Sequence, residues 1–250
     1  MNDRGDVQMT IALPTSALLH LPFEALAWAC AVGAAWLANR TGLTPADWRQ
    51  QTPPGAYLLC LAIGAILGAY IAGTLPDILR GQIGLGHSIA GALLGGIIGV
   101  ELYKHFTGMT RSTGGNFVLP LTVGIVIGRW GCLFAGMADQ TFGTPSDLPW
   151  AVMLEDGIAR HPVQAYESLA MLAFLIVFLI ALHQRARWAV GYGFQVMVIY
   201  YGTQRFIWEF LKPYPTVIDP LNSFHLICAA LVIYGLGWIA FNGTKEAPHA

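Results

Sequence analysis

Charged residues are scarce in this sequence: they make up 11% of its 250 residues, whereas a soluble domain carries about 25%. The formal net charge is only −1, so the chain has no basic excess with which to hold nucleic acid. Hydrophobic residues account for 55% of the chain, and its mean hydropathy is +0.56. This composition excludes an ordinary soluble domain and predicts a protein with several membrane spans.

The four cysteines show no C-x-x-C spacing and are scattered through apolar segments. We therefore predict neither a disulfide framework nor a zinc site. Histidine, aspartate and glutamate also lack a convincing ligand spacing along the chain. The sequence accordingly predicts no metal and no cofactor.

Seven apolar runs are each long enough for a membrane-spanning helix, which needs about 20 mostly apolar residues. We expect an all-α integral membrane protein in which residues 1–250 form a single membrane domain. The expected spans are 20–39, 56–75, 87–105, 116–136, 163–183, 189–211 and 222–241.

Lysine and arginine are unevenly shared between the two sets of loops, and this bias predicts the orientation. One set, which includes the C-terminal tail, holds Arg40, Arg49, Lys104, Arg111, Arg185, Arg187 and Lys245; the other holds Arg4, Arg80, Arg160 and Lys212. We therefore expect the N-terminus outside and the C-terminus in the cytoplasm. The long loop over 137–162, between the fourth and fifth spans, then lies on the outer face, and its length suggests a functional role.

Small residues recur at four-residue intervals in the second and third spans. They are Gly64 and Gly68 in the second span, and Gly91, Gly95 and Gly99 in the third. Such small faces let helices approach closely in lipid, so the pattern predicts that these two spans pack together.

Arg129 stands near the end of an otherwise apolar run. A permanent charge there costs at least ~2.5–3.5 kcal/mol on insertion scales, so something must compensate for it. Arg129 could pair with Glu167, could snorkel to the outer interface, or could bind an anionic ligand. Gly128 and Gly131 flank it and leave room for another group, which favours a ligand.

The sixth span carries polar residues at three- and four-residue intervals, so they share one helical face. They include Tyr201, Arg205, Glu209 and Lys212. Arg205 could simply pair with Glu209, one turn away. Alternatively, Arg205 and Arg129 could share one anion, because the planar guanidinium suits phosphate. Two arginines within the membrane suggest a lipid phosphate.

Three motifs stand in order within about residues 85–215: G-R-x-G at 128–131, R-H-P-x-Q-x-Y-E at 160–167, and Y-G-x-x-R-x-x-x-E-F at 201–210. Each motif is short, but the ordered set resembles the prolipoprotein diacylglyceryl transferase family. The resemblance implies a seven-span enzyme of the bacterial inner membrane. Such an enzyme moves the diacylglyceryl group of phosphatidylglycerol to the lipobox cysteine of a prolipoprotein, which forms a thioether and releases glycerol phosphate.

The resemblance also implies roles for individual residues. Arg129 and Arg205 would hold the phosphate and stabilise the charge of the leaving group, while His161 or Tyr201 would support proton transfer. Besides Arg129, the residues expected to bind substrate are Arg160, Gln164, Tyr166, Glu167, Glu209 and His87.

Two positions depart from the family pattern. Cys132 stands where members usually have asparagine, and Ala90 stands where they have a histidine, although His87 lies one turn earlier. Cys132 is a helical neighbour of Arg129, so it could act covalently or could be a small buried side chain. These departures keep two alternatives open: the same chemistry on a small non-lipoprotein acceptor, or a non-catalytic phospholipid-binding or transport protein.

Overall fold

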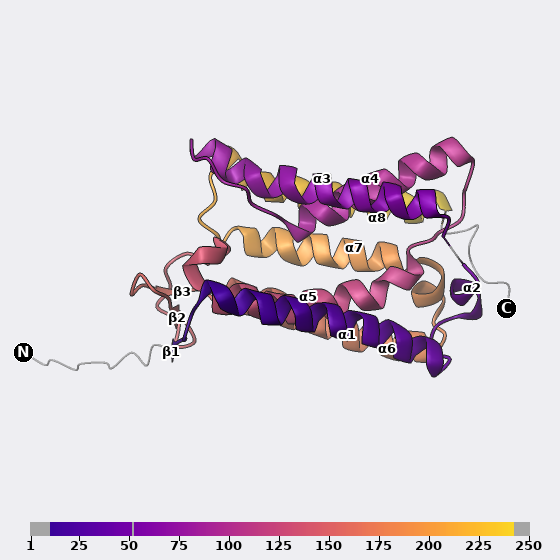
Figure 1. The fold of residues 1–250 in the computed structure, drawn as a ribbon, viewed down its shortest axis with the longest axis horizontal. Coiled ribbons are helices and arrows are strands. Elements are labelled where there is room, and N and C mark those ends of the chain that lie inside the picture. Colours follow the sequence, from indigo (N-terminus) through magenta and orange to yellow (C-terminus); the bar gives the residue numbers. More distant parts are fainter. Residues whose placement is uncertain (1–10, 52, 243–250) are drawn as a thin grey trace, which may run out of the picture.

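The computed structural model describes residues 11–51 and 53–242. Seven long helices make up most of this part of the chain, and they lie side by side along one direction (Figure 1). They are α1 (His20–Arg40), α3 (Gly55–Leu79), α4 (Ile89–Thr107), α5 (Val118–Ala135), α6 (Val163–His183), α7 (Arg187–Glu209) and α8 (Ser223–Asn242).

These helices coincide with the seven predicted apolar runs to within four residues at each end. Six of them are long and apolar enough to cross a membrane. The exception is α7, which carries Gln195, Gln204 and Arg205 on its buried side. The protein is therefore a mostly helical, multi-pass membrane protein.

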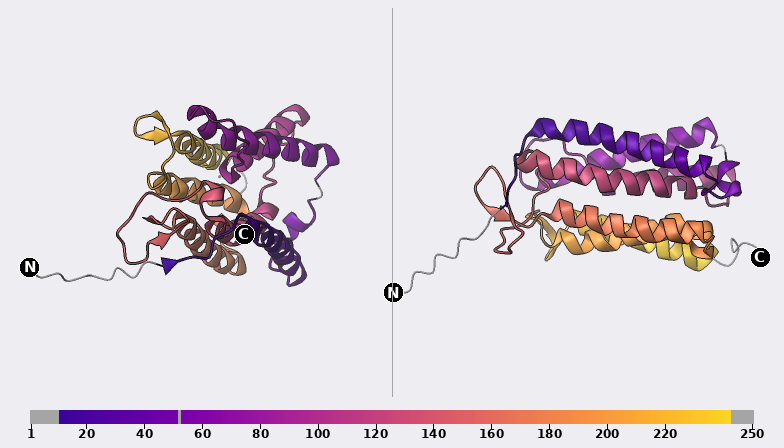
Figure 2. Two further views of the ribbon diagram at one scale, coloured as in Figure 1. Left: turned by 60° about the vertical axis from the view of Figure 1, so that its left-hand side comes forward. Right: turned by 90° about the horizontal axis from the view of Figure 1, so that it is seen from below.

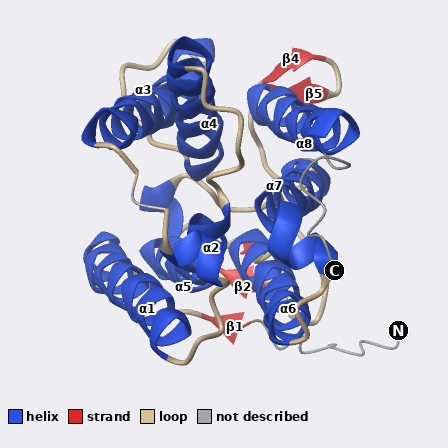
Figure 3. Cartoon of the chain, turned by 90° about the vertical axis from the view of Figure 1, so that its right-hand side faces the viewer, coloured by secondary structure: helices blue, strands red, loops and turns tan. Residues whose placement is uncertain are grey.

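Figure 3 shows how the helices are grouped: α3, α4 and α8 lie on one side, α1, α5 and α6 lie on the other, and α7 runs between them. The most extensive helix–helix contacts join α3 to α4, α1 to α5 and α7 to α8. A short helix, α2 (Ala46–Arg49), marks one end of the bundle, which we call the α2 end.

The outward faces of the bundle are apolar. Along α3, for example, Leu59, Ile63, Leu67 and Ile71 are all exposed. Exposed apolar surface on this scale is unusual for a soluble monomer, but it is the expected surface for a helix that faces lipid.

Glycines let α3 and α4 approach each other closely, as their spacing predicts. A Cβ atom on Gly68 would overlap the backbone of Gly91, and one on Gly95 would overlap the carbonyl oxygen of Gly64. The helix pair therefore packs backbone against backbone, so the prediction that these spans pack together is confirmed.

Five short strands qualify the prediction of an all-α fold. β1 (Ile11–Ala12) pairs in parallel with β2 (Val152–Met153), which pairs antiparallel with β3 (Ala159–Arg160). β4 (Thr216–Ile218) and β5 (Leu221–Asn222) form a hairpin before α8. The β1–β3 sheet lies beyond the helices at the end opposite α2 (Figure 2), and we call this end the sheet end.

The long loop between α5 and α6 is thus partly ordered by backbone pairing. Two of its strands, β2 and β3, form a hairpin, and the segment before α1 adds β1 to it. Two of the cations used to predict the orientation, Arg4 and Lys245, lie outside the described residues.

Candidate active site

Three helices bring their polar residues together near the sheet end. Because α5 and α7 run towards this end and α6 runs away from it, the last turns of two helices meet the first turns of the third. Arg129, Glu167, Arg205 and Glu209 are each at most 3% exposed. The snorkelling alternative for Arg129 is therefore wrong.

Glu167 is the centre of a buried network of ion pairs. Its Oε2 atom lies 2.5 Å from Arg129 Nε and 3.5 Å from Arg205 Nη1. Its other oxygen, Oε1, lies 2.5 Å from Lys212 Nζ. Glu209 Oε1 is 3.1 Å from both Arg205 Nη2 and Lys212 Nζ. We call these five side chains the ion-pair cluster.

The cluster contains both pairs that the sequence offered as alternatives to ligand binding, namely Arg129 with Glu167 and Arg205 with Glu209. It also contains Lys212, which is expected from the sequence to be a loop cation but is only 5% exposed. The signal for Lys212 was present in the sequence, because it continues the helical spacing three residues after Glu209.

The ion-pair cluster is not electrically balanced: it holds three cations and two carboxylates. Asp139, just beyond the end of α5, faces His20 instead, with 3.5 Å between Asp139 Oδ1 and His20 Nε2. Burying an unbalanced charge is costly unless a counter-charge is supplied. A cluster with one positive charge in excess is therefore suited to a singly charged anion.

Neighbouring groups fix the directions of the Arg205 and Glu209 side chains on α7. Arg205 Nη1 donates a hydrogen bond to the fully buried Tyr201 hydroxyl at 3.4 Å, and the guanidinium stacks over the Phe224 ring at 5.4 Å. Asn222 Nδ2 donates to Glu209 Oε2 at 3.5 Å, while Asn222 Oδ1 accepts from the first backbone amides of α8. The cluster is thus tied to α8 as well.

The R-H-P-x-Q-x-Y-E motif does not act as one unit. His161 Nδ1 lies 3.5 Å from the Tyr166 hydroxyl, which also accepts a hydrogen bond from Trp150 Nε1 at 2.8 Å. The Tyr166 ring packs on Trp208 with 5.2 Å between centroids. His161 and Tyr166 therefore lie beside the ion-pair cluster and have no ion pair or hydrogen bond with its members among the described contacts.

Arg160 holds the outer loop together. Its guanidinium donates to Asp156 Oδ2 at 2.5 Å and to the Gly143 carbonyl at 3.2 Å, and it stacks over the Phe142 ring. The hydrogen bond from Arg160 holds the pKa of the Asp156 carboxyl below its usual value. Contact between Arg160 and a substrate stays a prediction.

Gln164 and His87, both expected to bind substrate, contact residues outside the ion-pair cluster. Gln164 Nε2 donates to Thr141 Oγ1 at 3.3 Å, and the Thr141 hydroxyl donates in turn to Asp139. His87 is exposed in the segment before α4, and its ring centroid is 6.2 Å from that of His20.

The space beside Arg129 is filled by another part of the chain. A Cβ atom on Gly131 would lie 2.7 Å from Phe23 Cβ, and one on Gly128 would touch Ala27. The inference that these glycines leave room for a ligand is therefore wrong: they leave room for α1, which they bring against α5.

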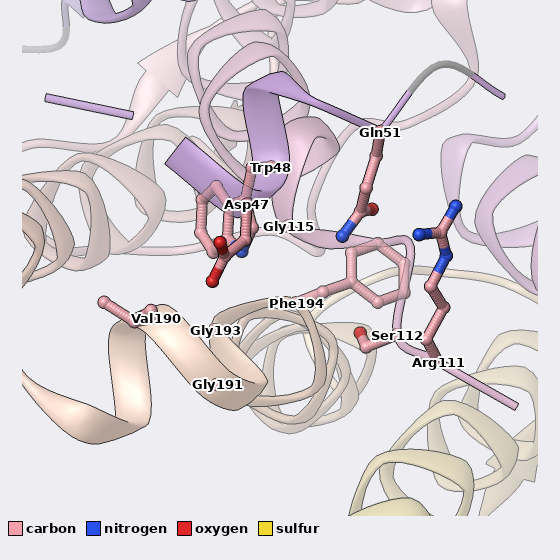
Figure 4. A pocket seen from close by; sticks show the side chains of 10 residues that line it. All are labelled: Asp47, Trp48, Gln51, Arg111, Ser112, Gly115, Val190, Gly191, Gly193 and Phe194. Carbon is pink, nitrogen blue, oxygen red and sulfur yellow. The ribbon is translucent and has the colours of Figure 1, made fainter. Parts of the chain in front are cut away.

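A cavity of about 250 Å³ lies at the opposite end of the bundle. Figure 4 shows Trp48, Phe194 and Arg111 around it, with Gln51 at its edge. It lies near the first turns of α7, whereas Arg205 and Glu209 are in the last turns. This cavity therefore takes no part in the ion-pair cluster.

The family model described as prolipoprotein diacylglyceryl transferase matches residues 23–241. The chain belongs to the prolipoprotein diacylglyceryl transferase family. The matched residues include every member of the ion-pair cluster, so the cluster lies within the part of the chain that the diacylglyceryl transferase model describes.

Three curated relatives carry the name phosphatidylglycerol–prolipoprotein diacylglyceryl transferase. The chain is 30% identical over 216 residues to the protein of Azoarcus sp. (strain BH72), which covers 76% of this chain and 77% of the relative. It is 30% identical to that of Clostridium tetani, covering 72% and 78%, and 28% identical to that of Pseudoalteromonas translucida, covering 82% and 81%. No solved structure matches the chain.

Proposed function

We propose that this protein transfers the diacylglyceryl group of phosphatidylglycerol to a thiol acceptor such as the lipobox cysteine of a prolipoprotein, with release of glycerol phosphate. The observation that carries the proposal is the excess positive charge of the ion-pair cluster. A phosphodiester carries a single negative charge, which matches this excess. Family membership and the names of the relatives support the same reaction.

In the proposed reaction, the thiol sulfur attacks the glycerol carbon and the carbon–oxygen bond to phosphate breaks. Negative charge then grows on the departing phosphate, where Arg129 and Arg205 stabilise it. Glu167 and Glu209 orient the two guanidinium groups, with which they are already paired. The contact of Tyr201 with Arg205 supports Tyr201 over His161 for proton transfer, because His161 Nδ1 lies 3.5 Å from the Tyr166 hydroxyl instead.

The reaction is tested with purified protein and phosphatidylglycerol labelled in its head-group glycerol. We expect labelled glycerol phosphate to appear only when a lipobox peptide is added, and we expect the peptide to gain the mass of a diacylglyceryl group. A peptide with serine in place of its cysteine is the matched control and should release nothing. Release without any peptide would favour a small acceptor, and no release under any condition would favour a phospholipid-binding or transport protein.

We further propose that α7 is a seventh span of a single membrane domain in the bacterial inner membrane. Its 23 residues are sufficient for a crossing, and it lies between helices that are themselves candidate spans. Its polar side chains face the bundle interior, as intramembrane charges usually do. With an odd number of spans, the two termini lie on opposite sides of the membrane. The lysine and arginine bias of the loops then supports an outward-facing sheet end, with the N-terminus outside and the C-terminus in the cytoplasm.

This orientation predicts the result of cysteine labelling in whole cells. In a variant without native cysteines, Ser146→Cys in the outer loop should react with an impermeant maleimide, whereas Gln184→Cys after α6 should react only once the cells are opened. Both positions lie outside helices and are at least partly accessible. The reverse pattern would place the ion-pair cluster on the cytoplasmic side.

A further inference from the structure

Three possible metal ligands from separate parts of the chain meet beside Arg129. They are His20 in the first turn of α1, Cys132 in the last turn of α5, and Asp139 at the end of the 3-10 helix Gly136–Asp139. One ligand atom from each residue lies within 4.8 Å of the others. Because the three residues have no regular spacing, the sequence expectation of no metal site could not anticipate this group.

The distances fit tetrahedral coordination. His20 Nε2 lies 3.5 Å from Asp139 Oδ1 and 3.8 Å from Cys132 Sγ. Zinc bonds of about 2.0–2.3 Å in a tetrahedron separate the ligand atoms by roughly 3.3–3.8 Å. The two separations from His20 are therefore near those that a zinc ion requires, and the third, between Cys132 and Asp139, is within 4.8 Å.

Two of the three ligands, His20 and Asp139, also have a partner that would orient them. His20 Nδ1 faces the Glu24 carboxylate at 3.9 Å, which leaves Nε2 to point at the other two ligands. Asp139 Oδ2 accepts a hydrogen bond from Thr141, which itself accepts one from Gln164. Outer partners of this kind are typical of zinc ligands, where they fix the tautomer and the direction of the coordinating atom.

The close contact of α1 with α5 produces this arrangement. At Gly131, a side chain would run into Phe23, and its Cβ would lie 3.5 Å from the backbone oxygen of His20. Glycine at this position lets the first turn of α1 rest on the last turn of α5. That contact sets the imidazole of His20 against the thiol of Cys132.

We propose that His20, Cys132 and Asp139 bind a zinc ion whose fourth position is open to the acceptor thiol. The sulfur, imidazole and carboxylate donors are those that zinc takes in proteins, and catalytic zinc sites keep three protein ligands and one open position. The His20 side chain is 25% exposed, so this group reaches the surface while the ion-pair cluster does not. The role that we assign to this zinc ion in diacylglyceryl transfer rests on the proposed function.

Arg129 connects the two sites. Its Nε atom is paired with Glu167 in the ion-pair cluster, and its Nη1 atom lies 3.8 Å from Cys132 Sγ. A thiol on the zinc ion would therefore stand next to a phosphodiester held by Arg129. This closeness is what attack on the glycerol carbon needs.

The chemical step balances without any further reactant. On binding to zinc, the acceptor thiol gives its proton to solvent, because a coordinating thiol is deprotonated by the metal. This step takes the place of proton transfer to Tyr201. The thiolate sulfur forms a bond to the glycerol carbon as the bond from that carbon to the phosphate oxygen breaks. The electron pair of the broken bond stays on phosphate, and the thioether, a weaker ligand than a thiolate, leaves the zinc ion.

The first test measures zinc on the full chain in detergent, after removal of metal with a chelator, incubation with Zn²⁺ alone and desalting. We expect wild-type protein to retain about one zinc ion per chain. Cys132→Ala, His20→Ala and Asp139→Ala should each bind zinc at least ~10-fold more weakly. Cys30→Ala is the matched control, because Cys30 is a free cysteine on the same helix as His20. Equal zinc binding by Cys132→Ala and wild type would overturn the proposal.

The second test needs no variant that could fail to fold. Wild-type protein loaded with Co²⁺ should show the near-ultraviolet absorption of a sulfur–cobalt bond, and this absorption should remain in Cys30→Ala. Its absence from wild type would overturn the site.

Transfer activity then separates this proposal from the proposed function. Zinc-free protein should lose transfer and regain it with Zn²⁺. Full transfer without zinc would overturn the metal's role while the proposed function stood. Zinc binding with no transfer to any acceptor would overturn the proposed function and the role of the metal, and only the binding site would stand.

Discussion

Arg129→Lys should lower diacylglyceryl transfer by about 10²–10³-fold, the loss typical of removing one donor to a developing oxyanion. The guanidinium of Arg129 reaches Glu167 through Nε and Cys132 through Nη1 at the same time. Lysine keeps the charge but offers a single nitrogen, so it cannot hold both contacts and a phosphate together. The measurement is the initial rate of glycerol phosphate release.

The matched control is Arg40→Lys. Arg40 is exposed at the C-terminal end of α1, where it stacks over Trp36, far along the bundle from the ion-pair cluster. This variant should keep wild-type activity, and a thermal melt should show both variants folded. If Arg129→Lys binds phosphatidylglycerol and turns it over as wild type does, Arg129 is a structural cation only.

Glu167→Leu should cost about 3–5 kcal/mol of unfolding free energy, the usual result of stranding buried charges. Glu167 is fully buried and contacts Arg129, Arg205 and Lys212. Without it, Arg205 and Lys212 would keep their pairing with Glu209, whereas Arg129 would lose its one ion pair among the described residues. Glu167→Gln keeps the shape and some hydrogen bonding, so its cost should be clearly smaller. Unfolding in mixed detergent, monitored by tryptophan fluorescence, measures the difference.

Asp47→Leu serves as the control for that comparison, because Asp47 is an exposed carboxylate on α2. The unfolding free energy of Asp47→Leu should lie within about 0.5 kcal/mol of the wild-type value, as for most surface substitutions. Equal stability of Glu167→Leu and Glu167→Gln would mean that the network does not hold α5, α6 and α7 together.

Much of the ion-pair cluster could be predicted from the sequence, for a physical reason. A charge such as Arg129 or Arg205 within an apolar run must meet an opposite charge, and the candidates on neighbouring runs were few. Helical spacing then put Arg205 and Glu209 on one face. The same helical spacing includes Lys212. Because Lys212 stands just after an apolar run, however, the sequence predicts a loop residue at this position.

Residues that are adjacent in the sequence have different surroundings where a helix begins. Arg160 and His161 precede α6, whereas Gln164 and Glu167 lie within its first turns. The four side chains therefore point to different surroundings: the outer loop, Tyr166, Thr141 and the ion-pair cluster. A short motif indicated the family correctly without indicating that its members share one site.

Contacts between distant segments could not be predicted in this way. His20 and Cys132 are 112 residues apart, and their contact depends on how α1 rests on Gly131. The sequence alone does not say which helix lies beside Gly131, so it cannot distinguish space for a ligand from space for α1.

The uneven charge of the ion-pair cluster also bears on how a reaction cycle would end. Phosphatidylglycerol brings one negative charge and makes the buried site neutral. Glycerol phosphate, a monoester, carries about −1.5 to −2 charges at neutral pH. Cleavage would thus turn a neutral complex into one with surplus negative charge inside the membrane, where such a surplus is poorly tolerated. The same three cations and two carboxylates that retain the lipid would expel the product, and turnover would need no separate device for release.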